Sequence, residues 1–196
     1  MKRPPVLVHG WRLFAHPLFL AQVQALAQQV ETLQRKDPEG YVNKNASKRL
    51  SAINKLAFDI IPQDPPRPEY RQGHTLGGAH KHWFRAKFFQ QYRLFFRYHA
   101  ASKVIVFAWV NDEQTKRAFE SGDDAYRVFR KMLESGQPPN DWDQLLRESE
   151  SKQLHKMDFF SPHHPRQSNA LIQTDQTPLF RDRQGQQIGI RDIRWS

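Results

Sequence analysis

The chain has 196 residues, 38% of them hydrophobic, and 30 Lys and Arg against 20 Asp and Glu give it a formal net charge of +10. It contains no cysteine, which excludes disulfides, thiolate metal sites and cysteine nucleophiles. No stretch approaches the roughly 20 apolar residues of a membrane span, and the basic N-terminus lacks the apolar run of a signal peptide. We therefore expect a soluble cytoplasmic protein whose positive field attracts polyanions.

The first third of the chain predicts two helices. After the strand-like stretch GWRLF, Pro17 opens a segment with a helical apolar period, made of Leu18, Val23, Leu26, Val30 and Leu33. Asp37 and Pro38 predict the N-cap and first position of a second helix that ends at Pro62. The Pro-rich segment 63–73 cannot be helix or central strand, so it predicts a connection to another element.

Three strands are predicted next. In WFRAKF and in YRLFFRY, apolar residues alternate with cations, which is typical of strands with two different faces. The short link FQQ between them predicts an antiparallel hairpin, although it has no glycine. The run KVIVFAWV is apolar on both faces, as a central strand would be. Helices followed by antiparallel strands indicate the α+β fold class.

The remaining elements predicted are helical. NDEQTKRAFES and DDAYRVFRKMLESG are read as two short helices, the second with Asp123 or Asp124 near its N-cap and Gly136 past its end. Asp141 predicts the cap of a last helix, DWDQLLRESESKQLHK. From about residue 156 the chain is rich in Gln, Pro, Ser and Arg, which predicts a loosely ordered extension with one hairpin around residues 183–186.

The positive charge is concentrated in the middle of the chain. Residues 70–111 contain no Asp or Glu, while seven Lys and Arg lie between them. The hairpin places Arg85 and Lys87 on the same face as Arg93 and Arg97, where four cations would suit phosphate groups. Trp83 and Phe95 share that face, and exposed aromatic side chains stack on unpaired bases. This pattern favours single-stranded nucleic acid, although a solvated strand face remains an alternative.

Such a site can also cut RNA, because RNA carries its own nucleophile in the 2′-hydroxyl. Arg85 and Arg93 suit stabilisation of the charge on the phosphorane. Lys87 is one candidate for the base, because neighbouring arginines lower its pKa; His74, His82 and His99 are others. The scheme needs no metal or cofactor, and the spacing of His74, His80 and His82 matches no zinc motif.

Several stretches of the chain resemble a known family in the same order. GWRLFAHPLF, VETLQRKDPEGY, HWFRAKFFQQYRLFFRY, VIVFAWVNDEQT, DAYRVFRKMLESGQPPNDW and LLRESE are similar to the YhaV toxins of PrlF-YhaV toxin–antitoxin systems. The resemblance runs from about residue 8 to residue 150. It implies a RelE-like α+β fold, with a helical hairpin and further helices on a twisted antiparallel sheet. It places the toxin domain at residues 1–155 and the extension at residues 156–196.

The resemblance also implies an activity, partners and a site. The activity is that of a metal-independent endoribonuclease that cleaves mRNA, expected at the ribosome, and inhibits translation and growth. The partners are a PrlF-like antitoxin and, through their joint complex, operator DNA. Matched by motif, the catalytic positions are Arg85, Lys87 and Arg93, with Arg97 weaker. RNA-binding residues are predicted to be Arg71, Lys81, His82, Trp83, Phe95, Tyr98 and Asn111.

One departure and two alternatives stay open. RelE-like toxins often place a tyrosine just after the last strand, whereas this chain has Asn111, Asp112, Glu113 and, later, Phe119. An acidic group there suits acid–base work or, more simply, the capping of the next helix. The alternative functions are a non-catalytic module that binds RNA, ribosome or operator DNA, and a face that serves chiefly to dock an acidic antitoxin segment.

Overall fold

The computed structural model describes residues 6–117, 124–150, 180–181 and 187–188. The chain divides into two compact units, residues 1–161 and 162–196. In the second unit, β6 (Phe180–Arg181) pairs antiparallel with β7 (Gln187–Ile188). The hairpin turn predicted at residues 183–186 lies outside the described residues. The domain boundary at residue 155 stays a prediction.

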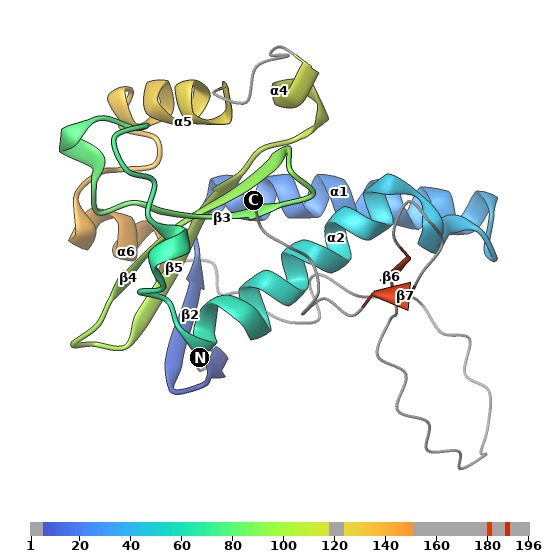
Figure 1. The fold of residues 1–196 in the computed structure, drawn as a ribbon, viewed down its shortest axis with the longest axis horizontal. Coiled ribbons are helices and arrows are strands. Elements are labelled where there is room, and N and C mark those ends of the chain that lie inside the picture. Colours follow the sequence, from blue (N-terminus) through green and yellow to red (C-terminus); the bar gives the residue numbers. More distant parts are fainter. Residues whose placement is uncertain (1–5, 118–123, 151–179, 182–186, 189–196) are drawn as a thin grey trace. The chain divides into compact units, whose positions relative to one another are not determined.

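The first unit is built on a five-stranded sheet in the order β1-β2-β5-β4-β3 (Figure 1). The strands are β1 (Val6–Val8), β2 (Trp11–Ala15), β3 (Phe84–Phe88), β4 (Tyr92–His99) and β5 (Val104–Val110). Neighbours pair antiparallel except β2 and β5, which are parallel with Arg12 opposite Val104. The α+β class is confirmed, but the sheet is mixed. Parallel pairing arises because helices carry the chain away from β2 before β5 joins it.

The hairpin and the central strand were predicted correctly. The three-residue β3–β4 turn has no glycine, and Phe89 and Gln90 themselves take positive φ angles of 45° and 60°, a left-handed conformation that glycine adopts most readily. Every residue of β5 is buried, because helices cover both faces of the sheet at its centre. The N-terminal β1 was not predicted, since three residues are too few to show a period.

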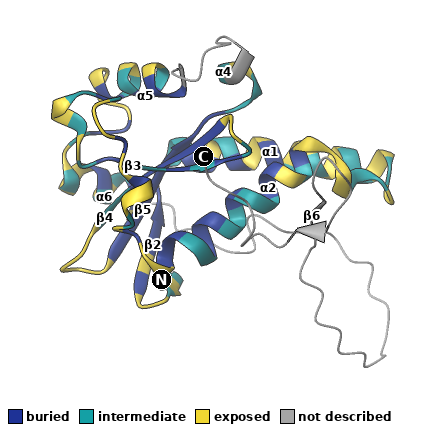
Figure 2. Cartoon of the chain, viewed as in Figure 1, coloured by how far each residue is buried: buried dark blue, intermediate teal, exposed yellow. Residues whose placement is uncertain are grey.

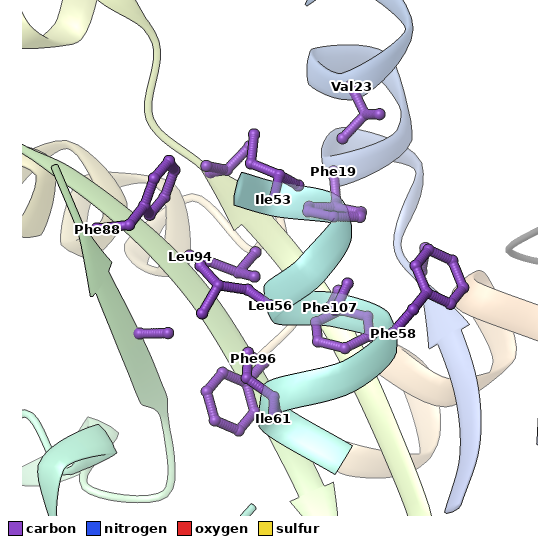
Figure 3. Close-up of a cluster of buried hydrophobic side chains, with 14 of the residues drawn as sticks. Phe19, Val23, Ile53, Leu56, Phe58, Ile61, Phe88, Leu94, Phe96 and Phe107 are labelled. Carbon is purple, nitrogen blue, oxygen red and sulfur yellow. The ribbon is translucent and has the colours of Figure 1, made fainter. Parts of the chain in front are cut away.

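Two helices cover one face of the sheet. They are α1 (Pro17–Lys36) and α2 (Asn45–Lys55), the latter continued by a π-helical turn at Leu56–Ile60 and by α3 (Ile61–Gln63). Their apolar side chains meet those of the strands in one core; Figure 3 labels Phe19, Val23, Ile53, Leu56, Phe58, Ile61, Phe88, Leu94, Phe96 and Phe107. This burial of side chains from both layers is the main source of stability on that face.

The helix caps correct one prediction. Pro17 starts α1 as expected, and the buried His16 is its N-cap, whose Nδ1 accepts the Leu18 N–H at 3.3 Å. Asp37, predicted to cap the second helix, instead ends α1 and accepts the Gly40 N–H through Oδ1 at 2.8 Å. A short 3-10 turn, Tyr41–Asn43, follows before α2 begins. The same side chain can therefore serve a turn as readily as a helix start.

The other face is covered by α5 (Asp124–Glu134) and α6 (Trp142–Glu150), while α4 (Glu113–Arg117) follows β5 (Figure 1). Gly136 ends α5 with φ of +78°, and Asp141 Oδ1 accepts the Gln144 N–H to cap α6, both as predicted. The predicted caps Asp123 and Asp124 cannot be compared, because Asp123 and the side chain of Asp124 lie outside the described residues. Within the described part of the chain, no helix is long and apolar enough to cross a membrane.

Candidate active site

Three cations project from the β3–β4 hairpin toward α5. In the antiparallel register Lys87 lies opposite Arg93, and Arg85 lies opposite Phe95. Residues directly opposite each other point to the same face of a sheet. Arg85, Lys87 and Arg93 therefore form one group, called here the cation cluster. The sequence-based prediction that these three side chains lie together agrees with this register.

Two guanidinium groups of the cation cluster are held in place by neutral oxygen atoms. Arg85 donates from Nε to the Tyr126 hydroxyl and from Nη1 to the Glu69 carbonyl at 2.9 Å. Arg93 is 9% exposed and donates from Nη1 to the carbonyls of Gln90 and Tyr92 at 2.8 and 2.9 Å. These bonds fix both groups without neutralising them, and each leaves N–H donors for a ligand.

Tyr126 of α5 connects the two arginines. Its ring centre lies 5.7 Å from the Arg85 guanidinium carbon and 5.9 Å from that of Arg93. The side chain is 5% exposed and packs edge-on against Phe95. Both the ring face and the hydroxyl oxygen are electron-rich, so Tyr126 stabilises two adjacent cations in a defined arrangement.

Lys87 differs from the arginines because its charge is labile. Burial lowers the pKa of its ammonium group below the ordinary 10.5, and the neighbouring charges of Arg85 and then Arg93 lower it further. Like charge alone was expected to lower this pKa, whereas desolvation contributes most. A lysine with a depressed pKa is a candidate proton acceptor.

No carboxylate neutralises the cation cluster within the described part of the chain. The ion pairs there are His16–Glu148, Lys44–Asp37, Arg49–Glu113 and Arg67–Asp64, and none of them includes Arg85, Lys87 or Arg93. Three like charges close together repel one another and lower the stability of the fold. An anionic ligand would relieve that repulsion, so the arrangement is suited to bind one.

The prediction that Trp83 and Phe95 are exposed on this face is wrong. Both side chains are fully buried, because α5 packs on them. Figure 2 shows β5, the neighbouring strand, coloured as buried. Phe129 of α5 stacks on Phe95 with ring centres 4.1 Å apart and meets Trp83 edge-on at 5.1 Å. Stacking of a base on either ring would require α5 to move away, so neither is a base-stacking surface in this structure.

Arg97 is not part of the cation cluster. It lies between two indole rings, at 5.5 Å from the centre of Trp83 and 5.2 Å from that of Trp142, and donates to the Asn140 carbonyl at 2.8 Å. Burial lowers its pKa to about 10, partly offset by Asp141. Arg97 therefore belongs to the packing between β4 and α6, and nothing in the structure supports the predicted catalytic role.

The remaining predicted RNA-binding residues are separated in the structure. Arg71 and Lys81 are exposed, and His82 is half-buried with Nε2 2.8 Å from Asn140 Oδ1. Tyr98 lies on the opposite face of the sheet, against Trp11 and Phe84. Asn111, which was predicted to bind RNA, is 1% exposed.

Asn111 has a structural role instead. Its Oδ1 accepts the backbone N–H of Arg93 at 2.7 Å, and its Nδ2 donates to the Gln91 carbonyl at 3.1 Å. The amide thus completes the backbone hydrogen bonding at the end of the hairpin. The carbonyls of Gln90 and Tyr92, at the same turn, hold the Arg93 guanidinium. By fixing the backbone of that turn, Asn111 helps to position Arg93 in the cation cluster.

Behind the sheet lies a buried polar network at the same end. Arg49 of α2 is 5% exposed; its Nη1 lies 3.7 Å from Glu113 Oε1, and its Nη2 donates to the Asn111 carbonyl at 3.3 Å. The Tyr92 hydroxyl also donates to Glu113 Oε1. The contacts of Glu113 with Arg49 and Tyr92 therefore hold α2, β4 and α4 together. Asp112 accepts the N–H groups of Gln114 and Thr115 and so caps α4. For Asp112, capping is confirmed.

Sequence reasoning missed Tyr126. A helix was predicted in this segment, but helical periodicity does not tell which sheet face a helix will cover. A tyrosine at the border of the helix's apolar stripe was the available signal, since its ring can be buried while its hydroxyl meets a polar group.

Among the described residues, no group of three or more His, Asp or Glu side chains is arranged to hold a metal ion.

Comparisons with known proteins show the family to which the chain belongs. The model of a family described as a toxin with endonuclease activity, of a toxin–antitoxin system, matches residues 13–150. The Ribonuclease toxin YhaV of Escherichia coli (strain K12) is 48% identical over 148 residues, which cover 74% of this chain and 96% of that protein. Toxin YhaV of E. coli O157:H7 shows the same identity and coverage. No solved structure matches. The chain belongs to the YhaV family, the endonuclease toxins of a toxin–antitoxin system.

Proposed function

We propose that this toxin cleaves single-stranded RNA at the cation cluster. The observation that carries the proposal is a set of three cations on one face of the hairpin. Neutral oxygen atoms hold Arg85 and Arg93, and none of the three cations forms an ion pair with a described carboxylate. A relative that is 48% identical is named a ribonuclease, which supports RNA as the substrate here too. A phosphodiester that enters the cluster supplies the missing negative charge.

The geometry suits cleavage that uses the 2′-hydroxyl of RNA as nucleophile. Lys87, in its neutral form, accepts the proton of the 2′-hydroxyl, and the resulting oxyanion attacks the adjacent phosphorus. Arg85 and Arg93 donate hydrogen bonds to the phosphorane oxygens, whose negative charge grows in the transition state. The bond to the 5′-oxygen breaks and that oxygen takes a proton from water, while Lys87 gives the proton it accepted back to solvent. The products are a 2′,3′-cyclic phosphate and a 5′-hydroxyl, and no step requires a metal ion.

Fragment analysis tests this proposal directly. Purified toxin is incubated with a single-stranded RNA in EDTA, and the fragment ends are identified by mass spectrometry. We expect 2′,3′-cyclic phosphates with the wild type and at least a hundredfold slower cleavage with Arg85→Ala and Arg93→Ala. Magnesium-dependent cleavage, or products ending in 3′-hydroxyl and 5′-phosphate, would contradict the mechanism.

A second arm of the experiment addresses the ribosome. We infer that the physiological substrate is mRNA on the ribosome, so translating ribosomes are supplied when free RNA is left intact. Cleavage of mRNA only in ribosomes would support that inference and explain an arrest of translation. Absence of cleavage on both substrates would leave the cation cluster as a binding face and refute the proposed chemistry.

The toxin family implies an antitoxin partner, and we propose that it is of the PrlF type and covers the cation cluster. An acidic segment of the antitoxin would neutralise the same three cations that a phosphodiester does. The joint complex is then the species that binds operator DNA. Competition measures this: antitoxin should displace RNA from wild-type toxin, and Arg85→Ala should weaken both ligands together.

A further inference from the structure

A second concentration of positive charge lies outside the cation cluster, in residues 71–82, called here the basic loop. It contains Arg71, His74, His80, Lys81 and His82, and it has no Asp or Glu. Arg71, His74 and Lys81 are exposed. A row of exposed cations is often only a solvated surface, so the loop needs further features before a ligand is inferred.

The first feature is that the loop has buried side chains and internal hydrogen bonds. Gln72 is 4% exposed, and its side chain crosses the loop, donating to the His80 carbonyl at 3.0 Å and accepting the Leu76 N–H at 2.9 Å. Leu76 is 1% exposed and packs in the core under α5. Two glycines, at 73 and 77, take positive φ angles of 62° and 88°, which let the chain turn back on itself. The loop thus holds its cations on a fixed backbone.

The second feature is attachment to the rest of the site. Arg130 of α5 donates from Nη2 to the Thr75 carbonyl, and the backbone of Arg71 bridges to Phe84 at the start of β3. Just before the loop, the Glu69 carbonyl accepts the Arg85 Nη1–H. The loop and the cation cluster are therefore joined through direct contacts.

The third feature is that no described carboxylate pairs with the exposed cations of the loop. Among the described residues, no ion pair includes Arg71 or Lys81, although cations elsewhere in the fold do pair with carboxylates. Glu69 precedes the loop in sequence, and Asp141 acts on Arg97. Fixed, exposed and unpaired cations next to a phosphodiester site are suited to a second stretch of the same polyanion.

We propose that the basic loop is a preformed surface that binds the phosphate backbone of single-stranded RNA outside the cleavage site. This inference rests on the proposed function and names the part of the substrate that the loop contacts. Arg71 and Lys81 each contact a backbone phosphate, while the cleaved phosphodiester lies in the cation cluster. Loop contacts of this kind strengthen binding without touching the reacting atoms.

Salt dependence of binding tests the proposal. The probe is a fluorescent 2′-O-methyl RNA, which lacks the nucleophile and cannot be cut by the proposed chemistry, and its affinity is measured by anisotropy from low to high salt. For Arg71→Gln/Lys81→Gln we expect the slope of log K against log salt to fall by about 1.4, because each phosphate contact of a single strand contributes about 0.7. Circular dichroism checks that the variant is folded.

A matched control removes the same charge elsewhere. Lys36→Gln/Lys48→Gln alters two exposed lysines of α1 and α2, and it should change the slope by less than half as much. With cleavable RNA, the loop variant should raise KM and leave kcat unchanged. Equal slopes for both double variants, or unchanged RNA binding with weakened antitoxin binding, would overturn the proposal.

The outcome for the loop is separate from that for the enzyme. If wild type binds the 2′-O-methyl RNA through the loop but never cleaves the natural RNA, the proposed function fails and the loop surface stands. If RNA is cleaved and the loop variant has the wild-type slope and KM, the loop surface fails and the cleavage site stands.

Discussion

Arg49 and Arg93 lie on opposite faces of the same end of the sheet, and both are nearly buried. Arg49 lies over the ring of Tyr92 at 4.3 Å and close to the carboxylate of Glu113. Arg93 lies near the ring of Tyr126 but has only carbonyl oxygens as hydrogen-bond acceptors among the described residues. A buried arginine with its own carboxylate serves the fold, whereas one without a carboxylate is left for an external anion.

Replacing each arginine by methionine tests this contrast, and the largest expected effect is on cleavage. Arg93→Met should slow single-turnover cleavage roughly 10²–10³-fold, since it removes donors to the phosphorane. Its stability should stay the same or rise, because a buried cation without a carboxylate is removed. Single-turnover rates and urea unfolding measure the two quantities; cleavage within threefold of wild type would remove Arg93 from the site.

Arg49→Met should show the opposite pattern. It removes the Arg49 cation from beside the Glu113 carboxylate, which costs about 2 kcal/mol of unfolding free energy, less than for a fully buried pair because Glu113 is a third exposed. Cleavage by the folded variant should change little. Urea unfolding of the two methionine variants side by side measures this, and equal losses of stability would erase the distinction between the two arginines.

Tyr126→Phe tests whether one neutral hydroxyl oxygen is enough to position a cation of the cluster. The ring and its packing on Phe95 are kept, while the acceptor of the Arg85 Nε–H is lost. We expect roughly tenfold slower cleavage, the effect of one hydrogen bond to a charged group, with unchanged stability. Tyr98→Phe, on the other face of the sheet, is the control. Equal rates for the two variants would show that the Tyr126 hydroxyl does not position Arg85.

The smallest effect expected is a shift of the pH–rate profile. If neutral Lys87 is the base, cleavage rises with pH and levels off below 10.5, because burial and the two arginines lower the pKa of Lys87. Arg85→Gln removes one positive neighbour, so the pKa of Lys87 rises and the profile moves to higher pH. Rates of Arg85→Gln and wild type, each scaled to its own maximum, are compared from neutral to alkaline pH. A shift to lower pH, or none, would exclude Lys87 as the titrating group.

Local patterns predicted most of the hairpin and its cations. Alternation of apolar and basic residues in β3 and β4 was sufficient to place Arg85, Lys87 and Arg93 on one face, and the resemblance to the YhaV family is confirmed. The partners of those cations were not predictable in this way. Tyr126 and the carbonyl of Glu69 come from segments far along the chain, and their arrival depends on how α5 and the loops pack.

The failures have the same origin. Trp83 and Phe95 share a face with the cations, so alternation alone made them appear exposed; only the packing of Phe129 buries them. Asn111 was read as a polar residue after a strand, whereas its amide replaces a missing backbone partner at the hairpin end. Periodicity reports which residues share a face, and it does not report what covers that face.

The parallel pairing of β2 with β5 has a consequence for synthesis of the chain. Arg12 finds its partner only at Val104, so the central part of the sheet cannot assemble until most of the domain has been translated. Tyr126 follows later still, and with it the contacts that hold Arg85. A ribosome that makes this toxin therefore cannot complete the cation cluster with its supporting contacts until both β5 and α5 have been translated.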